Sequence, residues 1–460
     1  MLGSSGAANG TSFTTYGWLA CFWGLITSFQ HGYHVSVLNQ IQAVLICEDL
    51  GNNTNTVPWA HKPSTCISMS DLEFSFVTSV LAIGGLCGSM VANLVIDSRG
   101  RRGTHWLCAV FGGVGNVFMG LGGSIFALSF GRFLIGFASG LGLCVGPIYM
   151  AEIVPSGNRG ISVLMPMSIG VGIMVTQIVG LNFATPDSWR YVFLVSLSLS
   201  AFQAITAFGI VESPAFLLTQ NRLEEQKTSA HRLWGGPYVA LSPEEPDLNE
   251  PQTLDENQLE TSSLLEVFKR TELRIPLLVV CLAMLSQQIS GINAVLFYSN
   301  NILSKTLPDL GPYVSVVITM VNVMMSIPSI FLLDRLGRRK IFILSTFVAV
   351  CSVILIGYGL NSNSPKLASV AIVTFIMAFA FGLGPIPFVI LPEVSPRHAV
   401  SALSSIALST NWIVGFVVGL VFIPFQYLLS GGDELKEGRI FYLFAGLLSL
   451  AVLSLSRLAW

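Results

Sequence analysis

The chain has 460 residues, of which 52% are hydrophobic and only 10% are charged. A soluble domain carries about 25% charged residues, so this composition predicts a polytopic membrane protein. The net charge of −2 gives no sign of a nucleic-acid-binding surface, since such surfaces are strongly basic. The Lys and Arg residues lie in short clusters between long apolar runs.

A membrane-spanning helix needs about 20 mainly apolar residues, and the sequence contains twelve runs of that kind. We expect an all-α membrane protein with transmembrane helices at 16–38, 71–96, 104–123, 126–150, 161–183, 190–211, 274–298, 311–333, 341–360, 367–391, 401–425 and 439–459. The polar stretch after the sixth run divides the chain. The expected parts are an N-terminus at 1–15, an N-terminal bundle at 16–211, a linker with short helices at 212–273 and a C-terminal bundle at 274–460.

The distribution of basic residues predicts the orientation, because Lys and Arg are enriched in cytoplasmic loops. Most of them fall on the side that also holds both termini and the linker, so we expect these parts to be cytoplasmic. The polar loop 47–70 then faces outward. It contains a glycosylation sequon at Asn52 and two cysteines, Cys47 and Cys66. A disulfide between them and a pair of reduced thiols are both open.

Two signatures occur once in each half of the chain. The sequence DSRGRR at 97–102 corresponds to DRLGRR at 334–339, and EIVPSGNRG at 152–160 corresponds to EVSPRHAVS at 393–401. The two pairs follow the same order at nearly the same spacing. Parallel repeats of this kind predict two halves related by a pseudo-two-fold axis along the membrane normal, with a binding site at their interface near mid-depth.

The stretch 286–300, SQQISGINAVLFYSN, puts many polar residues into an apolar span. At about 100° per residue its amides and hydroxyls point to several sides of a helix. We therefore expect a helix that is loosened at Gly291 and lines a wet cavity, where irregular backbone is tolerated. Neutral amides suit a ligand with many hydroxyl groups, since each offers donors and acceptors. The alternative is that these amides only hold neighbouring helices together.

A second unusual stretch is FGLGPIPF at 381–388. Its two prolines each remove a backbone donor and clash with the preceding turn, so we expect an interrupted helix beside the cavity. The paired Asp–Arg loops could form ion pairs at the inner face that lock one conformation and release on rocking. The alternative is that they serve only to set the topology.

Several of these motifs together resemble the sugar porter family of the major facilitator superfamily, and most of all its glucose-transporter type. They are QQISGINAVLFYS at 287–299, DRLGRR, GRFLIG at 131–136, EIVPSGNRG and GLGPIPF. The resemblance implies the major facilitator fold, with two pseudo-symmetric six-helix bundles. It also implies that a monosaccharide is bound by Gln287, Gln288, Asn293, Asn322, Phe388, Asn411 and Trp412. The implied gating and salt-bridge network at the inner face comprises Asp97, Arg101, Arg102, Glu152, Arg159, Asp334, Arg338, Arg339 and Glu393.

The sequence departs from the family at two informative positions. Pro166 stands where members usually have a glutamine that contacts sugar, which removes one expected contact. His34 stands where proton-coupled members have an aspartate. Because histidine titrates near neutral pH, we hypothesise that His34 makes transport pH-sensitive without acting as a carboxylate relay. The alternative is a neutral imidazole that is hydrogen-bonded within the bundle.

We therefore expect a transporter that moves a hexose such as glucose by alternating access, driven by the sugar gradient alone. The alternatives are a proton-coupled sugar symporter and a sugar receptor that does not transport; a sugar-dependent flux distinguishes the receptor. The expected partners are the sugar, the lipid bilayer and, in the symporter alternative, protons. The sequence shows no carboxylate pair, nucleophile motif or metal-spaced cluster, so we expect no enzyme, cofactor or metal site. The expected location is the plasma membrane, with an internal membrane such as the vacuole as the alternative.

Overall fold

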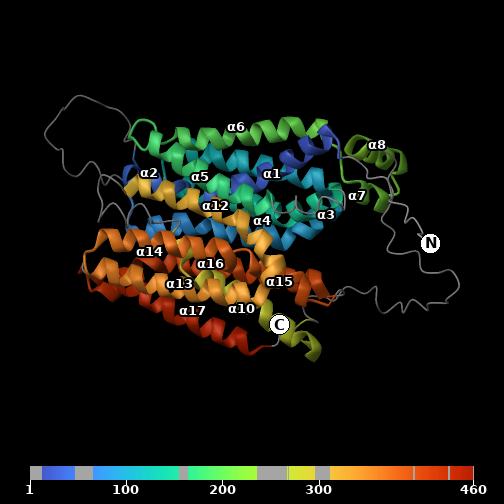
Figure 1. The fold of residues 1–460 in the computed structure, drawn as a ribbon. Helices are drawn as coiled ribbons and strands as arrows, with labels where there is room; N and C mark the ends of the chain where they lie inside the picture. Colours follow the sequence, from blue (N-terminus) through green and yellow to red (C-terminus); the bar gives the residue numbers. More distant parts are fainter. Residues whose placement is uncertain are drawn as a thin grey trace, which may run out of the picture.

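The structure, a computed structural model, is all-helical over the residues that it describes (Figure 1). These residues are 13–46, 66–154, 164–235, 267, 269–295, 311–396, 399–433 and 436–458. The N-terminal helices are α1 (Thr15–Val35), α2 (Val37–Leu45), α3 (Asp71–Leu121), α4 (Ile125–Ile153), α5 (Leu164–Phe183) and α6 (Tyr191–Thr206). The C-terminal helices are α10 (Arg274–Ile289), α12 (Gly311–Leu336), α13 (Arg338–Asn361), α14 (Pro365–Ala378), α15 (Ile386–Val394), α16 (Val400–Ser430) and α17 (Arg439–Arg457). Short helices α7 (Pro214–Thr219) and α8 (Leu223–Trp234) belong to the predicted linker.

Helix α3 contains two membrane spans. Its 51 residues would extend about 76 Å as a straight helix, more than twice the hydrocarbon thickness of a bilayer. The helix is interrupted at Gly100, whose φ of 76° and ψ of −177° are not helical. The break falls in the predicted loop DSRGRR, so the two expected spans at 71–96 and 104–123 are joined end to end.

The described helices account for twelve spans when α3 is counted twice, α1 is joined to α2, and α14 is joined to α15. Nine helical stretches of the described residues, with α3 counted once and α14 joined to α15, are long and apolar enough to cross a membrane. Helix α1 is not among them, because it carries polar residues such as Gln30, His31 and His34. It bends at Ser36 and continues as α2 to Leu45, beyond the expected end of the span at 38.

The chain forms two groups of helices. Figure 1 shows α1 to α6 on one side and α13 to α17 on the other, with α7 and α8 at one end of the first group. The two groups meet where α3 packs against α16 and α5 packs against α12. The part boundaries expected from the sequence stay predictions, since much of the linker lies outside the described residues.

Helices α3 and α4 pack with their backbones in contact. A Cβ atom added to Gly84 would collide with the carbonyl oxygen of Phe133, and one added to Gly136 would collide with that of Leu81. The same holds for Gly88 one turn further along α3. Glycine at these positions allows the close approach that membrane helices use where small residues face each other.

The exposed surface of the helices carries large apolar side chains, and many polar side chains are buried between the helices. Leu94, Leu121 and Phe208 are each more than 70% exposed, which fits a surface that faces lipid. By contrast, Gln30 and Gln203 are buried within the first group of helices. Buried polar residues in a membrane bundle usually mark a substrate or ion pathway, and they lead to the candidate site.

Candidate substrate-binding site

The candidate site begins at the predicted break near Gly291. Helix α10 ends at Ile289, and Gly291 follows with a φ of 85°, a conformation that suits glycine because it has no Cβ. The hydroxyl groups of Ser286 and Ser290 donate to carbonyl oxygens of their own helix, at 2.7 and 2.6 Å. The serines are therefore satisfied locally, and only the amides reach outward.

Three amides of this stretch form a chain of hydrogen bonds with Asn411 of α16. Asn411 Nδ2 donates to Gln287 Oε1 at 2.6 Å, and Gln288 Nε2 donates to Asn411 Oδ1 at 2.8 Å. Asn293 Nδ2 donates in turn to Gln288 Oε1 at 2.5 Å. Gln287 and Gln288 are only 6% and 8% exposed. We call these four residues the amide cluster; four of the seven predicted sugar contacts lie together in it.

The amide cluster also touches the interrupted helix. Phe379–Leu383 forms a π-helical turn between α14 and α15, which overlaps the start of the stretch 381–388 that was predicted to be irregular. Gln287 Nε2 donates to the carbonyl oxygen of Gly384 at 2.7 Å, immediately after this turn. The amide cluster is therefore hydrogen-bonded to an irregular segment of the C-terminal half. π-Helical turns are frequent at functional sites.

The other three predicted contacts lie at different places. Trp412 is the neighbour of Asn411 and packs on α3, 2.6 Å from where a Cβ on Gly85 would lie. Asn322 lies on α12, where its Oδ1 would be 3.5 Å from a Cβ on Gly170 of α5. Both are thus at the contact between the halves. Phe388 is 46% exposed on α15, and a role as an apolar wall stays a prediction.

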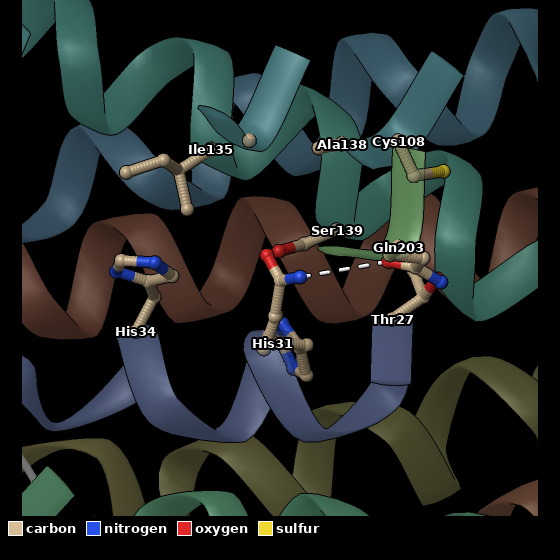
Figure 2. A pocket seen from close by; sticks show the side chains of 10 residues that line it. Thr27, His31, His34, Cys108, Ile135, Ala138, Ser139 and Gln203 are labelled. Atoms are coloured by element: carbon tan, nitrogen blue, oxygen red, sulfur yellow. Dashed lines mark hydrogen bonds between the residues drawn. The ribbon is translucent and has the colours of Figure 1, made fainter. Parts of the chain in front are cut away.

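The N-terminal half carries a polar network that the sequence analysis missed. Gln203 Nε2 donates to Thr27 Oγ1 at 2.8 Å, and Thr27 Oγ1 is hydrogen-bonded to His105 Nδ1 at 2.8 Å. Ser200 Oγ donates to Gln30 Oε1 at 2.8 Å. Gln30 Nε2 donates in turn to Gln203 Oε1 at 3.5 Å, and the dashed line that ends at Gln203 in Figure 2 marks this bond. The signal was present in α6, where Ser196, Ser200 and Gln203 follow the helical spacing of four and three residues.

His34 lies at the end of this network. Its Nε2 is hydrogen-bonded to Ser196 Oγ at 2.8 Å, and Asn116 Nδ2 donates to the same hydroxyl at 3.1 Å. The fully buried Arg132 holds the backbone here, since its Nη1 donates to the carbonyl oxygen of His34 at 2.6 Å and its Nη2 to that of Thr78 at 2.9 Å. His34 is therefore a hydrogen-bonded imidazole inside the N-terminal half, and its predicted pH sensitivity is not tested by this geometry.

The inner-face network is built around the break at Gly100. Arg101 Nη2 is paired with Glu152 Oε1 at 2.7 Å. Glu212, which the sequence analysis did not include, accepts from the backbone N–H groups of Arg101 and Arg102 at 2.9 and 3.0 Å. Its signal was the short motif VESPAFLL at 211–218. All these residues belong to the N-terminal side, so ion pairs between the halves stay a prediction.

The remaining predicted residues are placed as follows. Asp97 is exposed at the end of the first part of α3, and Arg339 Nη2 donates to the carbonyl oxygen of Ser456 at 2.8 Å. Arg338 lies half-buried at the start of α13. Asp334 and Glu393 fall near the ends of α12 and α15. Cys66 is disulfide-bonded. Pro166 is exposed in the first turn of α5. Three further predicted residues, Cys47, Asn52 and Arg159, lie outside the described residues.

Comparison with known proteins identifies the family of this chain. Residues 20–456 match the family model for sugar and other transporters. This chain belongs to that family. It is 31% identical to the human facilitated glucose transporter member 3, covering 92% of this chain and 85% of that protein. It is 29% identical to a probable metabolite transport protein of Saccharomyces cerevisiae, covering 92% and 88%.

Solved structures confirm the expected fold. The partially occluded inward-open structure of the xylose transporter XylE from Escherichia coli matches with a TM-score of 0.72 at 18% identity, over 97% of this chain and all of that one. The proton:xylose symporter XylE bound to 6-bromo-6-deoxy-D-glucose matches with a TM-score of 0.71. The family match identifies a multi-pass membrane transporter rather than an enzyme, and the solved structures show its major facilitator fold.

Proposed function

We propose that this protein transports a monosaccharide, most simply a hexose such as glucose, by alternating access. The observation that carries the proposal is the amide cluster, four neutral amides that are hydrogen-bonded to one another beside the contact between the halves. A sugar hydroxyl can replace either partner of such a bond, because it both donates and accepts. The relatives named as facilitated glucose transporters support the same class of substrate.

The driving force that we propose is the sugar gradient alone. Helix α1 contains no Asp or Glu, and the position of the aspartate in proton-coupled members is held by His34. His34 is bonded to neutral groups, Ser196 and through it Asn116. The alternative is proton symport, which the fold shared with the proton:xylose symporter XylE favours. In that case protons would be a second substrate.

We place the protein in the plasma membrane, with both termini on the cytoplasmic side. The alternative is an internal membrane; one relative, 28% identical, is the vacuolar protein sorting-associated protein 73 of Saccharomyces cerevisiae. In either membrane the halves would rock about the sugar. The contacts that must then open and close are those of α3 with α16 and of α5 with α12, because these join the two halves.

Uptake of radiolabelled glucose into proteoliposomes tests the proposal. Uptake is expected to equilibrate without an imposed proton gradient and to fall in Gln287→Ala, which removes the bonds to Asn411 and Gly384. Accumulation only under a proton gradient would establish the symporter instead. Binding of sugar without any flux would establish the receptor, and neither binding nor flux with any monosaccharide would refute a monosaccharide as the substrate.

A further inference from the structure

His31 lies where the N-terminal half faces the predicted sugar site. It is on α1, one turn from Thr27 on one side and from His34 on the other, and the three side chains line the same small cavity of about 10 Å³ (Figure 2). Its imidazole meets the indole of Trp412 edge to face, with ring centroids 5.9 Å apart and an angle of 83° between the planes. Trp412 directly follows Asn411 of the amide cluster.

The Nδ1 atom of His31 is buried and has no hydrogen-bond partner among the described residues. Buried polar atoms in folded proteins are almost always hydrogen-bonded, so an exception calls for an explanation. The neighbouring polar atoms that could reach His31 are mostly engaged. Thr27 is bonded to His105 and Gln203, and Nε2 of His34 is bonded to Ser196, although Nδ1 of His34 also has no partner among the described residues. Nδ1 of His31 is therefore available to a group that enters the site.

An imidazole suits a hydroxyl group as that partner. In its neutral form one ring nitrogen donates and the other accepts, and a hydroxyl can do either. The amide cluster approaches the site from the C-terminal half, whereas His31 approaches it from the N-terminal half. A ligand bound by both would make contacts that exist only when the halves are closed around it, which is how a ligand shifts a conformational equilibrium.

We propose that His31 is a specificity-determining residue that hydrogen-bonds one particular hydroxyl group of the sugar from the N-terminal half. This inference rests on the proposed function. The polar contact would compensate for the glutamine that Pro166 replaces. A protein site that hydrogen-bonds a hydroxyl rejects the analogue that lacks it, because the buried group is then left unpaired.

A panel of monodeoxy glucoses tests the assignment. Each analogue competes with radiolabelled glucose for uptake, in the wild type and in His31→Phe, which keeps an aromatic edge against Trp412 but removes both nitrogens. Loss of one hydrogen bond is expected to weaken glucose roughly 3- to 10-fold in His31→Phe. One analogue is expected to be weaker than glucose in the wild type and to lose that disadvantage in the variant. His231→Phe, on the exposed face of α8, is the matched control.

The outcomes separate this inference from the proposed function. If wild-type uptake depends on Gln287 but His31→Phe keeps the wild-type affinity for glucose and for every analogue, His31 only packs against Trp412 and the inference is refuted. If the wild type takes up no monosaccharide, the proposed function fails first. Should His31→Phe not cycle, His31→Asn and sugar-induced shifts in melting temperature give the same comparison. The asparagine variant is expected to retain part of the discrimination between glucose and one analogue. If His31→Asn distinguishes every analogue from glucose as strongly as the wild type does, the assignment is also refuted.

Discussion

Removing Glu212 should destabilise the N-terminal half measurably. Its carboxylate accepts from the backbone N–H groups of Arg101 and Arg102, at the start of the second part of α3. It therefore caps a helix N-terminus, where a negative charge also interacts well with the helix dipole. Loss of a capping side chain costs about 0.5–2 kcal/mol. We expect the upper part of that range, about 1–2 kcal/mol, for Glu212→Ala, because two charge-assisted bonds are lost at once.

Thermal unfolding in detergent measures this effect. For domains of 150–250 residues each kcal/mol lowers Tm by about 2–4 °C, so Glu212→Ala should melt about 2–8 °C below the wild type. Glu212→Gln keeps an acceptor oxygen and should fall between the two.

The matched control is Glu225→Ala on α8. Glu225 is paired with Arg222, but both side chains are more than half exposed, and such surface pairs contribute at most about 1 kcal/mol. A Glu212→Ala protein that melts no lower than Glu225→Ala would show that the carboxylate does not stabilise the break at Gly100, and the reasoning would fail.

Three further predictions concern binding, pH and packing. Asn411→Ala removes an amide that we propose to bond the sugar. Loss of two such bonds costs about 1–3 kcal/mol, so the KM for uptake should rise about 5- to 150-fold; an unchanged KM, or an equal rise in exposed Asn182→Ala, would contradict this. The His34 imidazole is buried, bonded to Ser196 and close to Arg132, which favours its neutral form. Uptake should therefore follow the same profile in the wild type and in His34→Asn between about pH 5 and 8, whereas a variation that disappears only in the variant would establish the hypothesised pH sensitivity. Gly136→Ala places a methyl group against a carbonyl oxygen of α3 and should cost about 1–3 kcal/mol, seen as a lower Tm. Gly123→Ala meets open space and should melt like the wild type.

The sequence predicted the spans and singled out three residues of the amide cluster, Gln287, Gln288 and Asn293, because both are local patterns. Apolar runs of bilayer length define the helices, and the polar run at 286–300 stands out within one of them. Asn411 could be linked to that run only through the resemblance to a family. The pairing itself, Gln287 and Gln288 on opposite sides of one asparagine amide, depends on how α10 and α16 pack.

The network of the N-terminal half escaped prediction for the opposite reason. Ser196, Ser200 and Gln203 are single polar residues spread along an apolar helix, and each alone is unremarkable. They become a network only when α1 packs against α6 and brings Thr27 and Gln30 to them. Glu212 stands in the motif VESPAFLL, but its capping role could not be inferred, because its partners are backbone N–H groups, which carry no signature in the sequence.

The glycine contacts between α3 and α4 determine where the carrier can move. Backbones that touch at Gly84, Gly88 and Gly136 have no side chains that could rotate to absorb a sliding motion. In the alternating access that we propose, these two helices are therefore expected to move as one rigid body. Between α3 and α16 the contact is instead made by the indole of Trp412 on Gly85, and a side chain can change its rotamer or separate from a flat surface. The same helix thus has one edge that is fixed and one that can part from its neighbour.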